Sequence, residues 1–255
     1  MIYKYRKWNQ FTHNGIVNGD IYFSRLFDLN DPFEGDFRLS AKALIVSMAK
    51  NMKRSGDKRE IREIINGLEA LNAAQKINLD EKIRIDRNLI KKSSYIFSAS
   101  KIFDDIVMWT HYAENHKGIC IGYDDKIIDI KMPDGINIVH DDNESVFTTV
   151  QYKNDSLILK QDSNGNFKVD EILRQKSTQW SYEEEVRIIA ASSRTTKSGF
   201  SAKIDRASIK EVMIGANASE EFVEEIVHIC QLVNISVFRM AINHGEFKLM
   251  KFRLW

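Results

Sequence analysis

The chain has 255 residues, of which 43% are hydrophobic and 29% are charged, a composition typical of a globular protein. Its 37 basic and 36 acidic side chains leave a net charge of +1, which excludes a chain-wide basic field of the kind that binds nucleic acid non-specifically. No apolar run approaches the roughly 18 residues of a membrane span, and no signal peptide precedes the two cysteines, Cys120 and Cys230. We therefore expect a cytoplasmic protein with two free, buried thiols and no membrane partner.

The amino-terminal segment alternates between strand and turn patterns. MIYKYRKW has the alternation of a strand, a short helix is expected at 11–17 with Gly19 closing it, and DIYFS at 20–24 predicts a second strand. The loop RLFDLNDPFEGDF follows, in which Pro32 disfavours helix at the preceding residue and Gly35 breaks the chain. Because this loop is also rich in Leu and Phe, we expect it to be held against the core.

A helical block interrupts the strands at about 40–93. Ser40, Asp57 and Asn78 are suitable caps for three successive helices, and the apolar residues after each cap recur with helical spacing. The block therefore predicts a three-helix insertion at about 38–94 within a single domain that covers 1–255.

The rest of the chain predicts mostly strands with a few helices. A strand is expected at 95–98, followed by a helix that Asp104 caps and Gly118 ends. Further strands are expected at 118–123, within 136–153, and at 183–191, 200–204, 210–216, 235–242 and 246–254, with helices within 164–180 and at 218–234. The predicted fold class is α+β, with a mixed or antiparallel β-sheet body and the three-helix insertion.

The segment EEEVRII carries the main candidates for catalysis. Alternate side chains of a strand share a face, so Glu183, Glu185 and Arg187 are predicted to lie together. Two carboxylates on one face are a common arrangement for glycosidic-bond chemistry, in which one stabilises an oxocarbenium-like sugar and the other positions the nucleophile. The alternative is a solvated strand start in which Arg187 pairs with Glu185.

The NDPFE loop offers three further polar side chains. Asn30 and Asp31 fit a structural turn in which a side chain accepts from a nearby backbone amide. Turn chemistry explains Glu34 less well, so Glu34 remains a candidate ligand-binding residue.

Two further segments have open interpretations. Arg6, at the end of the first strand, is either an anion ligand or a surface residue beside Lys4 and Lys7. His111 and His116 are five residues apart and do not share a helix face, which argues against a zinc pair.

These segments resemble the pattern of a bacterial family of unknown function. The pattern consists of YKYR, NDPFE, MWxHYAxxHxG and WxYExExR, which stand here at 3–6, 30–34, 108–118 and 180–187. The order and spacing of the four segments cover most of the chain outside the helical block.

The layout is also similar to the ADP-ribosyltransferase superfamily, particularly its toxin-like and nucleic-acid-modifying members. The resemblance implies that NAD is the substrate, that Glu185 binds the nicotinamide ribose and stabilises the oxocarbenium-like state, and that Glu183 lies near the acceptor. The middle-strand residue of that superfamily would be Ser98 or Ser24, although no Ser-Thr-Ser triplet is present. The implied NAD-binding residues are Arg6, Tyr5, Ser24, Asn30, Glu34, Ser98, Trp109, His111 and Tyr112.

The expected function is therefore that of an ADP-ribosyltransferase-like effector. Such a protein transfers ADP-ribose from NAD to a protein or nucleic acid, or hydrolyses NAD, and the setting would be a toxin with its antitoxin partner or phage defence. One alternative is a metal-dependent hydrolase or nuclease that uses Asp31, Glu34, Glu183 and Glu185 as ligands for Mg²⁺ or Mn²⁺. A second alternative is a binding module without chemistry.

Overall fold

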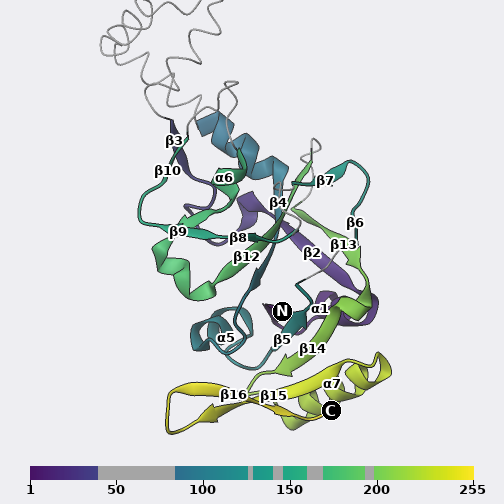
Figure 1. The fold of residues 1–255 in the computed structure, drawn as a ribbon. Coiled ribbons are helices and arrows are strands. Elements are labelled where there is room, and N and C mark those ends of the chain that lie inside the picture. Colours follow the sequence, from purple (N-terminus) through teal and green to yellow (C-terminus); the bar gives the residue numbers. More distant parts are fainter. Residues whose placement is uncertain (40–83, 126–128, 140–145, 160–168, 193–197) are drawn as a thin grey trace, which may run out of the picture.

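The structure is a computed structural model that describes residues 1–39, 84–125, 129–139, 146–159, 169–192 and 198–255. It has a mixed α+β architecture around one large, mostly antiparallel sheet, which confirms the predicted fold class at this level (Figure 1). The predicted helix caps Ser40, Asp57 and Asn78 lie outside the described residues. Residues 84–93 are helical and lead directly into a strand of the large sheet.

The large sheet contains twelve of the described strands. Nine of them follow one another in the order β16-β15-β14-β5-β1-β4-β2-β13-β6, and β12 joins at β4 and carries β7 and β8. The strands of this sheet are β1 (Ile2–Arg6), β2 (Asp20–Arg25), β4 (Ser94–Ser100), β5 (Ile119–Tyr123), β6 (Ile130–Lys131), β7 (Ile136–Ile138), β8 (Thr148–Thr149), β12 (Glu185–Ser192), β13 (Gly199–Ile204), β14 (Ile209–Ile214), β15 (Ser236–Asn243) and β16 (Lys248–Arg253).

The other elements are short strand pairs and helices at the periphery. Two parallel pairs join β3 to β10 and β9 to β11. These strands are β3 (Phe37–Leu39), β9 (Gln151–Lys153), β10 (Leu157–Leu159) and β11 (Gln175–Ser177). Besides the helical residues 84–93, the helices are α1 (Gln10–Asn18), α5 (Ile106–Tyr112), α6 (Val169–Leu173) and α7 (Glu220–Leu232), and the 3-10 helices are η1 (Leu26–Asp28), η2 (Thr178–Glu183) and η3 (Arg206–Ser208).

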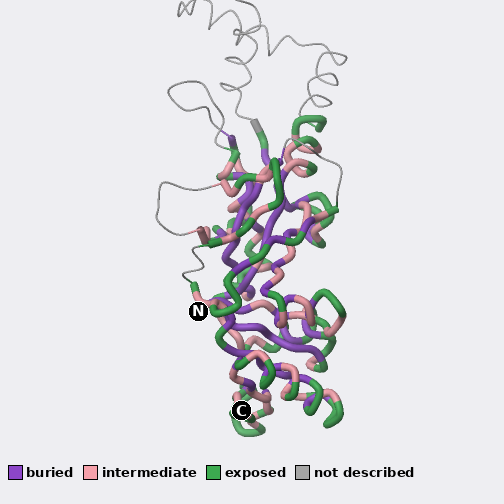
Figure 2. Tube along the Cα trace, turned by 90° about the vertical axis from the view of Figure 1, so that its right-hand side faces the viewer, coloured by how far each residue is buried: buried purple, intermediate pink, exposed green. Residues whose placement is uncertain are grey.

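Strand alternation divides the core between the two faces of the sheet. Ile2 on β1 packs on the face that α1 and α7 cover, and α7 contributes Ile226 and Cys230 to it. Tyr3 and Tyr5 point to the opposite face, which α5 covers. Buried segments therefore run through the centre of the molecule, with exposed turns outside them (Figure 2). Cys120 and Cys230 are both free and buried, as the sequence predicts.

The sheet divides at β4. One edge of β4 pairs with β12 over the whole length of β4. The opposite edge pairs with β2 at Tyr95 and Ile96, and with β1 only at Ser100. Ser98 lies between these two contacts, so the backbone on that edge has no strand partner at the point where β1 and β2 separate. This separation opens the space that the candidate site occupies.

The helix α5 is shorter than its sequence predicts. Asp105, rather than Asp104, caps the helix by accepting from the Met108 amide at 2.7 Å, and the helix ends at Tyr112. The following residues 114–116 all have positive φ, between 53° and 66°, so the chain winds in the left-handed sense before Gly118. The prediction that Gly118 ends this helix is therefore wrong, since the chain leaves the helix at Ala113.

Gly215 packs against this left-handed turn, and a side chain at this position is expected to destabilise the fold. A Cβ at Gly215 would lie 2.1 Å from the His116 carbonyl oxygen, which is a backbone atom that also accepts from the Asn217 amide. We expect Gly215→Ala to lower the free energy of unfolding by about 1–3 kcal/mol, because the overlap forces two backbone segments apart.

Urea denaturation measures this loss, with Gly245→Ala as the control. A Cβ at Gly245 would meet only the Asn243 side chain, at 3.6 Å. We expect the control to change stability by no more than about 0.5 kcal/mol. Equal effects of the two substitutions would show that the contact with His116 does not constrain the fold.

Candidate functional site

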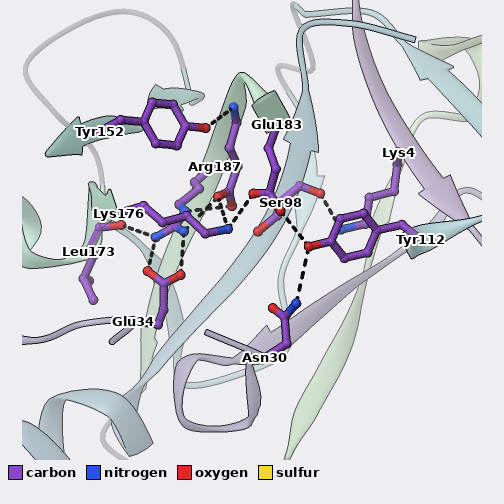
Figure 3. Close-up of polar contacts among 11 residues, drawn as sticks. Lys4, Asn30, Glu34, Ser98, Tyr112, Tyr152, Leu173, Lys176, Glu183 and Arg187 are labelled. Carbon is purple, nitrogen blue, oxygen red and sulfur yellow. Dashed lines mark hydrogen bonds and ion pairs between the residues drawn. The ribbon is translucent and has the colours of Figure 1, made fainter. Parts of the chain in front are cut away.

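A cavity of about 130 Å³ lies where β1, β2 and β4 separate. Its walls come from these strands, from the NDPFE loop, from α5, and from the segment β11–η2–β12. The polar and charged residues that line it are Tyr3, Lys4, Tyr5, Ser24, Asn30, Glu34, Ser98, Ser100, Tyr112, Lys176, Glu183, Glu185 and Arg187. Figure 3 draws most of the contacts among these side chains.

Arg187 is the centre of a buried ionic network. Its guanidinium is fully buried and donates two bonds to Glu34 at 2.8 and 2.9 Å, two to Glu185 at 2.8 and 2.9 Å, and one to the Leu173 carbonyl at 2.8 Å. These contacts use all five N–H donors of an arginine side chain. Arg187 therefore connects the NDPFE loop, β12 and the end of α6, and it has no donor left for a ligand.

Glu185 is held almost as completely. Its carboxylate accepts two bonds from Arg187, one from Lys176 at 3.1 Å, and a further hydrogen bond from the Ser98 side chain. Burial would raise its pKa, but Arg187 and Lys176 outweigh burial and hold the pKa of Glu185 well below its usual range. Four contacts fill the roughly four acceptor positions of a carboxylate, so Glu185 is a fixed negative charge.

The surroundings of Glu183 shift its pKa in the opposite direction to that of Glu185. Its carboxyl accepts from Lys176 at 2.5 Å and from the Tyr112 hydroxyl at 2.6 Å, which leaves about two acceptor positions open. Burial raises the pKa of Glu183, against the opposing effects of Lys176 and of the hydrogen bond from Tyr112. One wall of the cavity thus carries two carboxyl groups whose surroundings push their pKa values apart, a pattern that marks acid–base pairs in enzymes.

The backbone brings Glu183 to the cavity by a route that strand alternation does not provide. Glu183 ends the 3-10 helix η2, Glu184 has a φ of 42° in the left-handed region, and β12 begins only at Glu185. The prediction of a continuous strand from 183 is therefore wrong, although the two carboxylates do meet. The predicted pairing of Arg187 with Glu185 is confirmed, and a solvated strand start is wrong because both glutamates are 4% exposed.

Lys176 links the two carboxylates and was not predicted. It lies on β11, is 7% exposed, and its ammonium group sits 4.8 Å from the centre of the Trp180 ring. Burial would lower the pKa of Lys176, but Glu185 and Glu183 raise it on balance, so this lysine is charged. The sequence carries no signal for this role, because a lysine in the polar stretch RQKSTQW matches the pattern of a surface residue.

Eight of the eleven predicted site residues line the cavity. Besides Glu183 and Glu185, these are Tyr5, Ser24, Asn30, Glu34, Ser98 and Tyr112. Asn30 donates to the Tyr112 hydroxyl at 3.4 Å, which joins the NDPFE loop to α5 across the cavity. The NDPFE loop and α5 therefore both contribute to the cavity wall.

The other three predicted residues lie elsewhere. Trp109 is fully buried and donates its indole N–H to the Phe103 carbonyl at 2.7 Å, so it is part of the core. His111 is exposed on α5. Arg6 is half-buried outside the lining, where burial lowers its pKa and the nearby Tyr123 opposes that shift. The basic residue of β1 that does line the cavity is Lys4, two positions earlier.

The carboxylates of the proposed metal set do not face one open position. Arg187 already lies between Glu34 and Glu185, where a shared cation would bind. Asp31 accepts from the Phe33 amide at 2.9 Å, forms the predicted turn, and does not line the cavity as the other three carboxylates do. Among the residues that the structure describes, no group of three or more His, Cys, Asp and Glu side chains is arranged to hold a metal ion.

The chain is thus an α+β protein with a buried carboxylate and cation network at a small cavity. A family model described as a protein of unknown function (DUF2971) matches residues 108–188, which confirms the predicted likeness to such a family over this stretch. The matched stretch includes Tyr112, Lys176, Glu183, Glu185 and Arg187. No curated protein and no solved structure matches the chain, so the likeness to ADP-ribosyltransferases stays a prediction. No helix in the described ranges is both long and apolar enough to span a membrane.

Proposed function

We propose that the protein cleaves the bond between nicotinamide and ribose in NAD and transfers ADP-ribose to a macromolecule or to water. The observation that carries this proposal is the pair Glu183 and Glu185, which share Lys176 at the cavity wall with their pKa values shifted in opposite directions. Two carboxyl groups of unequal acidity beside a small cavity are suited to a reaction that develops positive charge on a sugar carbon.

The size of the cavity fits a substrate of which one ring enters the cavity. An engineered cavity of about 150 Å³ in another protein binds benzene, so a cavity of about 130 Å³ is comparable to a single small ring. Nicotinamide or its ribose fits this description, and the rest of the dinucleotide would lie outside the cavity. Asn30 is exposed and Tyr112 is half-buried, and these two polar residues of the lining are suited to orient the ring.

Glu183 is the residue that we place next to the reacting carbon. The bond from C1′ to the pyridinium nitrogen breaks, its electron pair leaves with nicotinamide, and C1′ becomes an oxocarbenium-like cation. The Glu183 carboxylate stabilises this cation through its unused acceptor positions. Water or an acceptor hydroxyl then bonds to C1′ and gives its proton to Glu183, whose raised pKa suits it to take up a proton.

Glu185 and Arg187 are positioning residues in this scheme. Glu185 holds Lys176, Arg187 holds Glu185, and Lys176 fixes one oxygen of Glu183. The expectation that Glu185 itself meets the substrate is less well supported, because its acceptor positions are filled. A metal-dependent reaction has less support for a similar reason, since Arg187 occupies the position between Glu34 and Glu185.

NAD turnover by the purified protein tests the proposal. We expect release of nicotinamide from NAD in the presence of a chelator, and transfer of adenine-labelled ADP-ribose to a macromolecule when cell lysate is added. Release without transfer would identify a glycohydrolase, and transfer to a protein or nucleic acid would identify the acceptor class of a toxin or defence effector. Neither release nor transfer, with no thermal shift by NAD, would refute the proposal and favour a binding module.

A further inference from the structure

Lys4 is a second basic group of the cavity, and neither Glu183 nor the ionic network accounts for it. It lies on β1, where it pairs with Ile121 of β5, and the preceding Tyr3 also pairs with Ser100 of β4. Lys4 is half-buried and lines the cavity, and its side chain donates a hydrogen bond to the carbonyl of Ser98, where the β4 edge opposite β12 has no strand partner. Figure 3 shows the Lys4 side chain with its hydrogen bond to Ser98, apart from the cluster around Arg187.

The surroundings of Lys4 differ from those of the other two cavity cations. Lys176 and Arg187 each contact two carboxylates, whereas none of the ion pairs among the described residues involves Lys4. The Lys4 ammonium instead lies 5.2 Å from the centre of the Phe97 ring. An amine that is partly removed from water, without a contacting carboxylate, keeps its nitrogen available for bonding to carbon.

Burial favours the neutral amine of Lys4. Burial lowers the pKa of Lys4 to about 7, and Arg6 on the same strand and Lys176 on β11 act in the same direction. Glu185 and Glu183, from β12 and η2, oppose this shift. At pH 7 an amine with a pKa of about 7 is roughly half neutral, whereas a lysine with the ordinary pKa near 10.4 is neutral in about one molecule in 2,500.

We propose that Lys4 is a nucleophilic amine that forms an imine with an aldehyde-bearing ligand about the size of a single sugar, such as the open-chain form of a pentose. The Lys4 nitrogen attacks the carbonyl carbon, a C=N bond replaces the C=O bond, and the carbonyl oxygen leaves as water with two protons from the amine. Glu183 lines the same cavity and is suited to carry a proton from nitrogen to oxygen. This inference does not depend on NAD turnover.

Reductive trapping tests the inference with glycolaldehyde as the probe and cyanoborohydride as the reductant, followed by peptide mapping by mass spectrometry. Lys7 is the internal control, because it is exposed and only three residues away. At pH 7 we expect Lys4 to gain the label at least about tenfold faster than Lys7, and we expect the difference to narrow as the pH rises towards 10. Lys4→Arg should leave the Lys7 labelling unchanged.

Labelling of Lys4 no faster than that of Lys7 in the wild type would overturn the inference, and this comparison does not depend on how the variant folds. Because the assay contains no NAD, a negative result here leaves the NAD proposal untouched. Conversely, preferential labelling of Lys4 in a protein that does not turn over NAD would support the imine site alone.

Discussion

Replacing Arg187 with methionine is expected to lower the free energy of unfolding by about 3–5 kcal/mol. The substitution leaves Glu34 and Glu185 buried without the cation that binds both of them, and the cost of an uncompensated buried charge is of this size. It also removes the donor to the Leu173 carbonyl. Such a loss is a third or more of the stability of many domains, so chemical denaturation must be followed at low temperature.

Arg253→Met is the matched control, because Arg253 is an exposed arginine on another strand of the same sheet. We expect it to change stability by no more than about 0.5 kcal/mol. Adding Glu34→Gln and Glu185→Gln to Arg187→Met should recover part of the loss, since the unpaired charges then disappear. A loss below about 1 kcal/mol for Arg187→Met alone would mean that water or rearrangement compensates the two carboxylates.

The strands were predictable because their signal is local. Alternation in IYKYR predicts β1, in which Lys4 and Arg6 are less buried than Tyr5, whereas β12 is buried on both faces. Helix patterns are local as well, so the helix predicted at 218–234 corresponds to α7, which Ser219 caps by accepting from the Phe222 amide. Asp105 was missed in favour of Asp104, because two adjacent aspartates offer the same capping chemistry and the sequence does not distinguish between them.

The network at the site was only partly predictable, because its contacts span the chain. Glu34 and Arg187 are 153 positions apart, and no local pattern reports that they meet. Glu183 was placed at the site on the assumption of a strand, whereas a 3-10 helix and the left-handed Glu184 carry it there. Lys4 stands within the YKYR segment, yet Arg6 was favoured because arginine is the more common anion ligand.

Replacing Glu183 with glutamine is expected to reduce NAD turnover by about 100-fold or more. Glutamine keeps the size of the side chain and one acceptor oxygen for Lys176 or Tyr112, but it removes the negative charge that opposes the oxocarbenium-like cation. Removal of one preorganised electrostatic contact to a transition state typically costs 10²–10³ in rate. Because this charge acts in the transition state, we expect the loss to fall on kcat rather than on KM.

Glu184→Gln is the matched control, because it makes the same chemical change one residue away on an exposed side chain. We expect its kcat and its midpoint of thermal unfolding to stay close to the wild-type values. Glu185→Gln should instead lower the midpoint of unfolding, since Arg187 and Lys176 then lose their shared carboxylate. If Glu185→Gln abolished turnover with unchanged stability while Glu183→Gln remained active, the catalytic role would belong to Glu185, and the assignment of Glu183 would be wrong.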